Sequence, residues 1–217
     1  MIVVGLTGSI GMGKSNAAGA LRTLGVPVHD ADGEVHRLLG PGGGAVKAVA
    51  AAFPGVLAGN RIDRKALGDR VFGDTAALRR LEAILHPLVR RSSRRFQAAA
   101  ARRGVKLAVL DIPLLYESRG EKTVDAVIVV SAPALVQRQR VLARPDMTEA
   151  KFRAILTRQV PDLQKRRRAD FVVATGGPRG DTFRQLQRIV RRIRTEGRRA
   201  LRKHPPSVGR GPAWASH

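Results

Sequence analysis

The stretch GLTGSIGMGKS, residues 5–15, decides how the rest of this chain is interpreted. From Gly8 to Ser15 it fits the pattern G-x-x-x-x-G-K-[ST] at every defined position. The glycines allow positive φ angles and leave no side chain between main-chain amides and a ligand. These amides converge on an anion at the N-terminus of the next helix, whose dipole favours negative charge. In such a loop Lys14 would reach the β and γ phosphates, and the Ser15 hydroxyl would face Mg²⁺.

The residues around this loop favour a phosphate-binding site over a plain glycine-rich turn. Residues 2–7 are short, apolar and β-branched, which predicts a buried strand. Apolar residues then recur at helical spacing over 14–24, and 27–30 reads as a second strand. A strand, a loop, a helix and a strand form one βαβ unit of a parallel sheet. We therefore predict that the chain binds a nucleoside triphosphate.

Further elements alternate along the chain in a way that predicts an α/β fold. The expected strands are 106–115, 124–132 and 169–175. The expected helices are 45–53, 63–72, 74–85, 87–103, a basic segment 133–168 broken at 144–146, and 181–203. Because no strand is expected between 33 and 103, this region predicts a helical insertion on the parallel sheet. The fold class is thus a P-loop NTPase-type parallel sheet flanked by helices, with a helical substrate-binding insertion and a helical lid.

Four parts of the chain follow from these breaks. The nucleotide-binding core is expected at 1–32 and 104–203, and the lid lies within it at about 137–168. The insertion covers 33–103. Residues 204–217 are rich in proline and glycine, which predicts a disordered tail.

Composition excludes several classes of protein. The 217 residues are 43% hydrophobic and contain no cysteine, which excludes a disulfide scaffold, a cysteine-ligated metal site and thiol catalysis. No apolar run approaches the roughly 20 residues of a membrane helix, and we expect a cytoplasmic protein without a membrane partner. The formal charge of +23 indicates attraction to phosphorylated ligands or other polyanions, unless it reflects only arginine-rich solvated helix faces.

Two features narrow the kind of nucleotide-binding protein. The N-K-x-D motif with which a GTPase reads its base is absent. A small kinase of a metabolite fits the length, the helical insertion and the arginine-rich segment, because lids of that kind supply positive charge over the phosphates.

At this point the sequence resembles one family, dephospho-CoA kinase. The resemblance covers most of residues 1–177 and keeps the order of the family's motifs. The matching pieces are GLTGSIGMGKS (5–15), HDAD (29–32), LHPLV (85–89), IPLLYE (112–117), VDAVIVVSAP (124–133), QRQRVLAR (137–144), Gln159 and ADFVV (169–173).

The resemblance implies an activity and its ligands. The activity is the transfer of a phosphoryl group from ATP, with Mg²⁺, to the ribose 3′-hydroxyl of dephospho-CoA, the last step of coenzyme A synthesis. It also implies that the insertion 33–103 holds the CoA moiety. We expect a monomer or a small homo-oligomer.

Three carboxylates are candidates for the chemistry. Asp32 fits the base that orients the acceptor hydroxyl and takes its proton; the alternative is a helix N-cap. Asp30 is assigned to structure or to the surroundings of Mg²⁺. Asp111 ends an expected strand, where P-loop proteins often place an acid that holds Mg²⁺; the alternative is a carboxylate satisfied by backbone amides.

Cationic and apolar residues complete the candidate site. Arg140 and Arg144 lie four residues apart on one helix face, where a guanidinium suits γ-phosphate oxygens, although Arg144 could equally belong to a solvated face. His36 is a candidate contact for CoA or an exposed helical histidine. His86, before Pro87, is expected at a turn between two helices. Residues 113–115 are expected to form an apolar wall near the acceptor.

The complete set of candidate residues is as follows. The catalytic residues are Lys14, Asp32 and Arg140; nucleotide-binding residues are Gly8, Ser9, Ile10, Gly11, Met12, Gly13, Lys14, Ser15, Arg144 and Thr175; substrate-binding residues are Asp32, His36, His86, Pro113, Leu114 and Leu115; metal ligands are Ser15 and Asp111. Ser9 and Met12 stand where the family's loop usually has a glycine and a small residue. Thr175 stands close to where the family commonly has an asparagine near the adenine, which leaves the preference for ATP over GTP open.

Two other functions compete with this interpretation. A kinase of a nucleoside monophosphate would share the loop, sheet and lid, but residues 30–32 and 113–117 match the dephospho-CoA kinase pattern as a set. A nucleic-acid-binding protein would use the positive charge. The aromatic content of 4% offers few stacking platforms, and no recognition module is present, so no specific nucleic-acid partner is expected.

Overall fold

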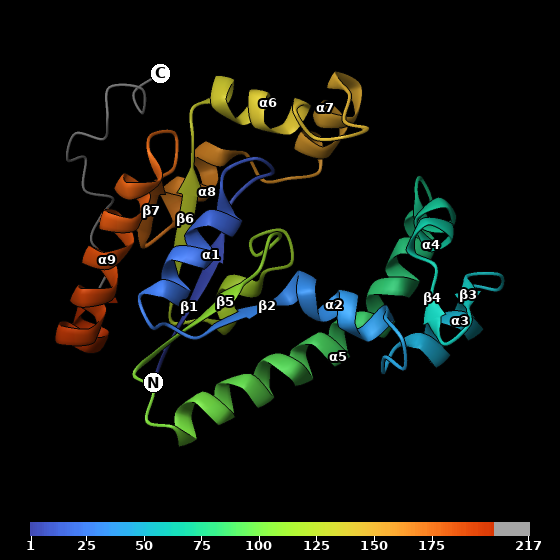
Figure 1. The fold of residues 1–217 in the computed structure, drawn as a ribbon, viewed down its shortest axis with the longest axis horizontal. Coiled ribbons are helices and arrows are strands. Elements are labelled where there is room, and N and C mark those ends of the chain that lie inside the picture. Colours follow the sequence, from blue (N-terminus) through green and yellow to red (C-terminus); the bar gives the residue numbers. More distant parts are fainter. Residues whose placement is uncertain (202–217) are drawn as a thin grey trace. The chain divides into compact units, whose positions relative to one another are not determined.

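A five-stranded sheet in the order β2-β5-β1-β6-β7 forms the centre of the first of two compact units (Figure 1). The structure, a computed structural model, describes residues 1–201. The unit with the sheet contains residues 1–29 and the described residues from 100 onward, and the second unit is Asp30–Ala99. The tail predicted at 204–217, and residues 202 and 203 of the predicted core, lie outside the described residues.

The strands run side by side in parallel. β1 (Ile2–Thr7) pairs in parallel with β5 (Leu107–Asp111) and with β6 (Ala126–Ser131), and β6 pairs in parallel with β7 (Phe171–Ala174). β2 (Val28–Asp30) is the edge strand beside β5. Because β1, β5 and β6 are buried on both faces, they are continuous apolar runs without alternation. The predicted α/β class with a parallel sheet flanked by helices is confirmed.

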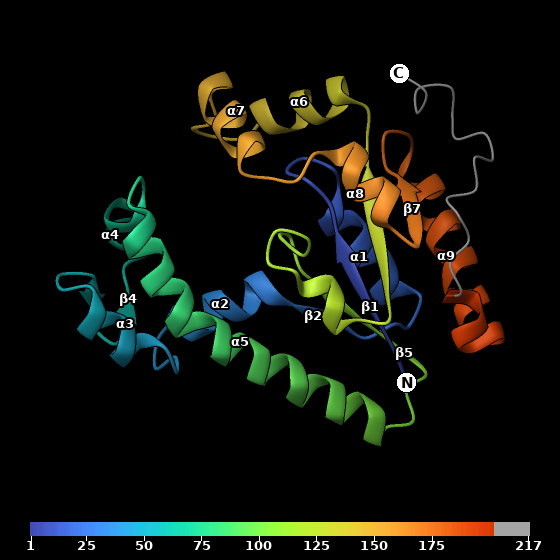
Figure 2. The same ribbon diagram turned by 180° about the vertical axis from the view of Figure 1, so that it is seen from behind.

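Helices cover both faces of the sheet (Figures 1 and 2). On one face α1 (Lys14–Thr23) and α9 (Arg179–Glu196) bury Leu21, Leu186 and Val190 against the strands. On the other face α8 (Asp162–Arg168) lies against β6, and Leu115 packs with Val127 and Val129. Leu115 comes so close to β1 that a Cβ on Gly5 would lie 2.8 Å from its Cδ2.

The predicted basic segment forms three helices instead of two. α6 (Ala134–Leu142) ends before the expected break, where Asp146 adopts a φ of 58°. α7 (Glu149–Thr157) follows, and a second break at 158–161 precedes α8. The last predicted helix also ends early, because Gly197 adopts a φ of 58° and starts the 3₁₀ helix η2 (Gly197–Leu201). A second 3₁₀ helix, η1 (Gly120–Thr123), precedes β6.

The second unit is mainly helical and has its own apolar core. Its elements are α2 (Ala31–Leu39), α3 (Val46–Ala52), β3 (Leu57–Ala58), β4 (Arg61–Ile62), α4 (Arg64–Val71) and the first part of α5 (Thr75–Arg102). Val49, Phe53 and Val56 are buried at its centre, and Leu38 and Leu85 pack there from α2 and α5.

Three details of this unit differ from the sequence-based expectation. A strand pair does interrupt it: β3 and β4 are antiparallel and joined at Gly59, whose φ is 62°. Two-residue strands are too short for any periodicity to reveal. α2 is not among the helices expected from the sequence. It contains Gly33, which disfavours a helix, yet the side chain of Asp30 caps it and Leu38 is buried.

The turn predicted at His86 and Pro87 is also wrong. α5 is one helix of 28 residues with Pro87 inside it, and His86 is exposed on its surface. Leu85 and Leu88 pack into the same core from either side of the proline. Burial of these side chains outweighs the one main-chain hydrogen bond that a proline removes.

Candidate active site

The phosphate-binding loop lies between β1 and α1, at the carboxyl edge of the parallel sheet. Gly11 and Gly13 have φ angles of 76° and 81°, a backbone region that favours glycine. Gly13 is the N-cap of α1, which has neither a side-chain cap nor an acidic residue in its first turn. The first amides of α1 are therefore not satisfied by a protein cap and suit an anion.

Close packing explains why the loop begins with a glycine and continues with small residues. A Cβ on Gly8 would lie 2.4 Å from Cγ2 of Val130 and 2.8 Å from its carbonyl oxygen. Ser9 is buried, and Met12 points into the core, where its sulfur accepts a 3.0 Å hydrogen bond from the amide of Ala132. The side chain of Met12 thus occupies no space in front of the amides.

Thr175, the residue after β7, supports the loop from beyond β6. Its hydroxyl lies 2.7 Å from the carbonyl oxygen of Met12 and 3.1 Å from that of Ser131, and the residue is buried. The hydroxyl is therefore committed to the main chain beneath the loop, while the carbonyl oxygen of Thr175 accepts a hydrogen bond from Arg140.

Lys14 and Asp111 form an ion pair at the sheet edge. Nζ of Lys14 lies 2.7 Å from Oδ1 of Asp111, whose side chain is 5% exposed. The pair joins the end of the loop to the end of β5. Ser15, the next residue, is exposed on the first turn of α1.

Ser15 and Asp111 fit a magnesium site of the kind found beside nucleotides. Mg²⁺ typically takes one or two protein oxygens and completes its shell with water and substrate phosphates. Within residues 1–201 no cluster of three or more His, Cys, Asp or Glu side chains could hold a metal, so an all-protein cage is not formed there. One hydroxyl and one carboxylate beside an anion cradle match the oxygen donors that Mg²⁺ prefers.

Arg140 lies beside the loop with one nitrogen unused. Nη2 donates a 2.7 Å hydrogen bond to the carbonyl oxygen of Thr175. Nη1 is buried and has no hydrogen-bond partner among residues 1–201. A Cβ on Gly13 would lie 3.5 Å from Nη1, which places this nitrogen at the loop. Arg144 lies beyond the end of α6 and is exposed, so the prediction that it shares a helix face with Arg140 is wrong.

The residues expected to form an apolar wall do not share one environment. The carbonyl oxygen of Pro113 accepts a 2.9 Å hydrogen bond from the hydroxyl of Thr7, and Leu114 is 46% exposed. Leu115 is fully buried beneath the sheet and presents no surface to a substrate. Only Pro113 and Leu114 are placed where they can meet a ligand.

The second unit carries the other two acidic candidates, Asp30 and Asp32. Asp30 is the N-cap of α2 and accepts a 3.0 Å hydrogen bond from the amide of Gly33. The alternative that Asp32 is the cap is therefore wrong, and Asp32 is exposed in the first turn of α2.

A pocket of about 380 Å³ lies within the second unit. It combines apolar surface with cationic side chains, and His36 is one of its residues. The lining residues are His36, Leu39, Gly40, Pro41, Ala58, Arg61, Ile62, Asp63 and Arg64.

Comparison with known proteins assigns the chain to a family. The family model described as dephospho-CoA kinase matches residues 2–178. The chain belongs to the dephospho-CoA kinase family. The resemblance seen in the sequence is thereby confirmed.

Individual relatives of this dephospho-CoA kinase family member match it over three quarters or more of its length. The dephospho-CoA kinase of Novosphingobium aromaticivorans is 55% identical over 91% of this chain and 97% of its own. That of Paramagnetospirillum magneticum is 61% identical over 76% of this chain and 78% of its own. The crystal structure of TT1252 from Thermus thermophilus superposes with a TM-score of 0.76 at 34% identity, covering 87% of this chain and 95% of that one.

Sequence reasoning assigned no role to two residues of this dephospho-CoA kinase family member that contact the loop directly. Gln137 and Gln159 both hydrogen-bond to the main chain of Ile10. Each belongs to a motif that carried the resemblance, but glutamine has no charge or characteristic spacing to reveal a role.

Among residues 1–201 no helix is both long and apolar enough to cross a bilayer.

Proposed function

We propose that this protein transfers the γ-phosphoryl group of ATP to the ribose 3′-hydroxyl of dephospho-CoA, which yields coenzyme A and ADP. The observation that carries the proposal is the match of residues 2–178 to the dephospho-CoA kinase family. The phosphate-binding loop, the uncapped α1 and the partly buried Lys14–Asp111 pair support it. Family membership does not favour the alternative of a nucleoside monophosphate kinase. The cytoplasmic location and the oligomeric state stay predictions.

The donor binds at the loop of the first unit. The phosphates are held by main-chain amides between Gly8 and Ser15 and by the Lys14 ammonium. Lys14 either leaves Asp111 for the γ-phosphate or contacts Asp111 and the γ-phosphate together. Ser15 and Asp111 would hold Mg²⁺. An ion held there would supply positive charge that neutralises the charge developing on the phosphates.

Asp32 serves the acceptor. Its carboxylate orients the 3′-hydroxyl and accepts the hydroxyl proton as the oxygen bonds to the γ-phosphorus. The bond from the γ-phosphorus to the bridging oxygen breaks, and its electron pair remains on ADP. Asp32 suits this role because it is exposed and, unlike Asp30, is not used as the cap of α2.

Arg140 stabilises the charge on the transferred group. Its Nη1 is buried beside Gly13 without a partner, while Nη2 fixes the guanidinium on Thr175. A preorganised donor of this kind requires no rearrangement as negative charge shifts toward the leaving oxygen. Arg144 adds charge from the surface of the lid.

The pocket of the second unit holds the remainder of dephospho-CoA. His36 lies four residues after Asp32 on α2, a rise of about 6 Å along the helix. A diphosphate attached to the same ribose would therefore meet His36, Arg61 and Arg64, whose donors suit phosphate oxygens. The apolar residues of the pocket, such as Leu39 and Ile62, suit the pantetheine arm.

The test is an ADP-release assay with purified protein and a panel of acceptors, combined with identification of the product. We expect turnover with dephospho-CoA and a 3′-phosphorylated product. Asp32→Asn should lower kcat much more than it weakens ATP binding, whereas Asp69→Asn, at an exposed position of α4, should not change kcat. Faster turnover of any nucleoside monophosphate would overturn the proposal.

A further inference from the structure

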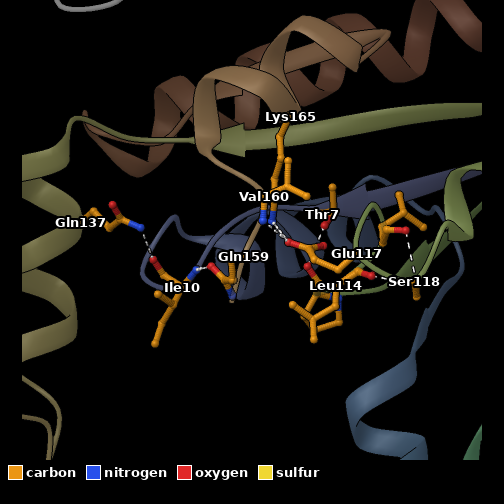
Figure 3. A network of polar contacts seen from close by, with 11 residues as sticks. Thr7, Ile10, Leu114, Glu117, Ser118, Gln137, Gln159, Val160 and Lys165 are labelled. Atoms are coloured by element: carbon orange, nitrogen blue, oxygen red, sulfur yellow. Dashed lines mark hydrogen bonds and ion pairs between the residues drawn. The ribbon is translucent and has the colours of Figure 1, made fainter. Parts of the chain in front are cut away.

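Both main-chain polar atoms of Ile10, at the tip of the phosphate loop, are held by glutamine side chains (Figure 3). Oε1 of Gln159 accepts a 3.1 Å hydrogen bond from the amide of Ile10. Nε2 of Gln137 donates a 2.7 Å hydrogen bond to the carbonyl oxygen of Ile10. The two glutamines lie 149 and 127 residues from Ile10 along the chain. The loop tip is thus fixed by the segment that follows β6.

Close packing brings α6 onto the same part of the loop. A Cβ on Gly11 would lie 2.6 Å from Cγ2 of Val141 and 3.0 Å from the carbonyl oxygen of Gln137. Gln137 is itself 6% exposed, so its amide is a buried polar group that needs the Ile10 partner. The loop and α6 are therefore joined by a hydrogen bond and by direct backbone contact.

The second glutamine is presented from a fixed support. Gln159 belongs to the link between α7 and α8, and the amide of the next residue, Val160, donates a 2.9 Å hydrogen bond to Oε1 of Glu117 (Figure 3). Nζ of Lys165 lies 2.9 Å from the same oxygen, an ionic contact rather than a well-directed hydrogen bond, and Lys165 is fully buried. A buried charge pair of this kind holds the link in place beside Gln159.

We propose that Gln137 and Gln159 are positioning residues that hold the tip of the phosphate loop, and that Gln137 acts through Arg140. Gln137 and Arg140 are three residues apart on α6, so they share one face of the helix. Anchoring Gln137 on the loop therefore sets where Nη1 of Arg140 lies relative to Gly13 and to a phosphate bound there. Neither glutamine needs to touch a substrate for this effect. The inference rests on the proposed phosphoryl transfer.

The directions of the hydrogen bonds predict that glutamate is tolerated at position 159 and not at position 137. Gln159 accepts, so Gln159→Glu keeps the acceptor and should retain kcat within about threefold at saturating ATP. Gln137 donates, so Gln137→Glu loses the donor and should lower kcat. Gln137→Met and Gln159→Met remove the bonds without adding charge. Since a misplacement of about 1 Å can cost 10²-fold in rate, we expect each Met variant to lose roughly 10- to 100-fold in kcat.

Matched controls are available on the same elements. Gln139 on α6 and Gln164 on α8 are exposed, so Gln139→Met and Gln164→Met should keep kcat. Melting temperatures of all variants separate loss of fold from loss of positioning. If Gln137→Met does not fold, the isosteric Gln137→Glu carries the test at that position.

The decisive measurement is a double-mutant cycle with Arg140→Ala. If Gln137 acts through Arg140, Gln137→Met should lower kcat less than threefold when Arg140 is already replaced by alanine. The shift in melting temperature caused by Gln137→Met should be the same in wild type and in Arg140→Ala. An equal loss of kcat in both backgrounds, or full kcat in Gln137→Met or Gln159→Met, would overturn the inference.

Hydrogen exchange separates this inference from the proposed function. Gln159→Met should speed exchange of the Ile10 amide without any substrate, and Gln164→Met should not. If wild-type protein phosphorylates no dephospho-CoA, the proposed function fails, and the cycle is run with whichever acceptor is phosphorylated. Unchanged exchange at Ile10 in Gln159→Met would contradict the contacts themselves.

Discussion

At the scale of single residues, Arg140 shows how an unsatisfied hydrogen-bond donor can point to a ligand site. A buried donor without a partner costs about 1–3 kcal/mol relative to a satisfied one. Nη1 of Arg140 is such a donor, and it lies beside Gly13 of the phosphate loop. Groups left unsatisfied in an otherwise well-bonded fold tend to occur where a ligand satisfies them.

Arg140→Ala should lower kcat by on the order of 10³-fold, because an arginine that meets the transferred phosphoryl group contributes that much. Stability should not fall with it, since the change removes an unsatisfied donor together with one hydrogen bond. Steady-state kinetics and thermal melting measure the two effects. Arg153→Ala, at an exposed position of α7, is the control. A loss of kcat below tenfold would mean that Arg140 only packs within the lid.

Asp162 is a second buried polar group near the carboxyl edge of the sheet. Its Oδ2 accepts a 2.7 Å hydrogen bond from the hydroxyl of Ser131, and its Oδ1 is buried without a partner among residues 1–201. Burial raises the pKa of this carboxyl above its ordinary value of 3.8, although the Ser131 hydroxyl and the nearby Arg166 and Lys165 oppose the rise. A raised pKa contributes stability below the unfolded value, and that contribution is lost as pH rises through the folded value.

Asp162→Asn should therefore gain stability relative to wild type as pH rises from about 4 to 7, because it removes the cost of a buried charge while its amide oxygen can still accept from Ser131. Urea denaturation of both proteins at several pH values gives the difference. Asp69→Asn, at an exposed position, should show no such trend. A difference that shrinks toward pH 7 would mean that the ionised carboxylate is favourably paired.

At the scale of elements, α5 shows packing prevailing over local preference. Its sequence contains Pro87, which removes a main-chain hydrogen bond and disfavours the preceding turn. The helix nevertheless continues, because Leu85 and Leu88 on either side of the proline reach the same core. α2 is similar, since its cap Asp30 and the burial of Leu38 outweigh Gly33.

Pro87→Ala should raise the free energy of unfolding, by as much as about 3 kcal/mol, because alanine restores the hydrogen bond and position 87 is exposed, so no packing is lost. Denaturant unfolding of the full chain measures the change. Arg90→Ala, at an exposed position of the same helix, should stay within about 0.5 kcal/mol. A fall in stability in Pro87→Ala would show that the proline itself fits a constraint of the helix.

At the scale of the whole molecule, the proposed ligand-binding residues are divided between two units. The phosphate loop, Asp111 and Arg140 belong to the unit with the sheet, whereas Asp32 and the pocket around His36 belong to Asp30–Ala99. The formal charge of +23 favours the approach of both anionic ligands. Each ligand alone should therefore stabilise mainly its own unit.

A non-hydrolysable ATP analogue at about 100 times its Kd should stabilise the protein by about 2.7 kcal/mol, because it binds only the folded state. Hydrogen exchange should then slow at residues 8–15 and along α1, whereas dephospho-CoA alone should slow it around the pocket at residues 36–64. In Lys14→Ala the stabilisation by the analogue should be largely lost. Protection of the pocket by the analogue, with the loop unchanged, would contradict this division.

The sequence by itself determined the phosphate loop, the parallel sheet and the family. These features depend on short motifs and on apolar periodicity, which are written in neighbouring residues. The short β3–β4 pair, the unbroken α5 and the cap at Asp30 were decided by contacts within the second unit that periodicity does not record.

Only the tertiary structure decided how the loop is held. Thr175 and Met12 are 163 residues apart, and Gln159 and Ile10 are 149 apart, yet each pair is joined by one hydrogen bond. No local pattern encodes such a pair, because the partners meet only after the strands have aligned their carboxyl ends at one edge of the sheet. For the same physical reason the burial of Leu115 and the unpartnered nitrogen of Arg140 became visible only in the folded chain.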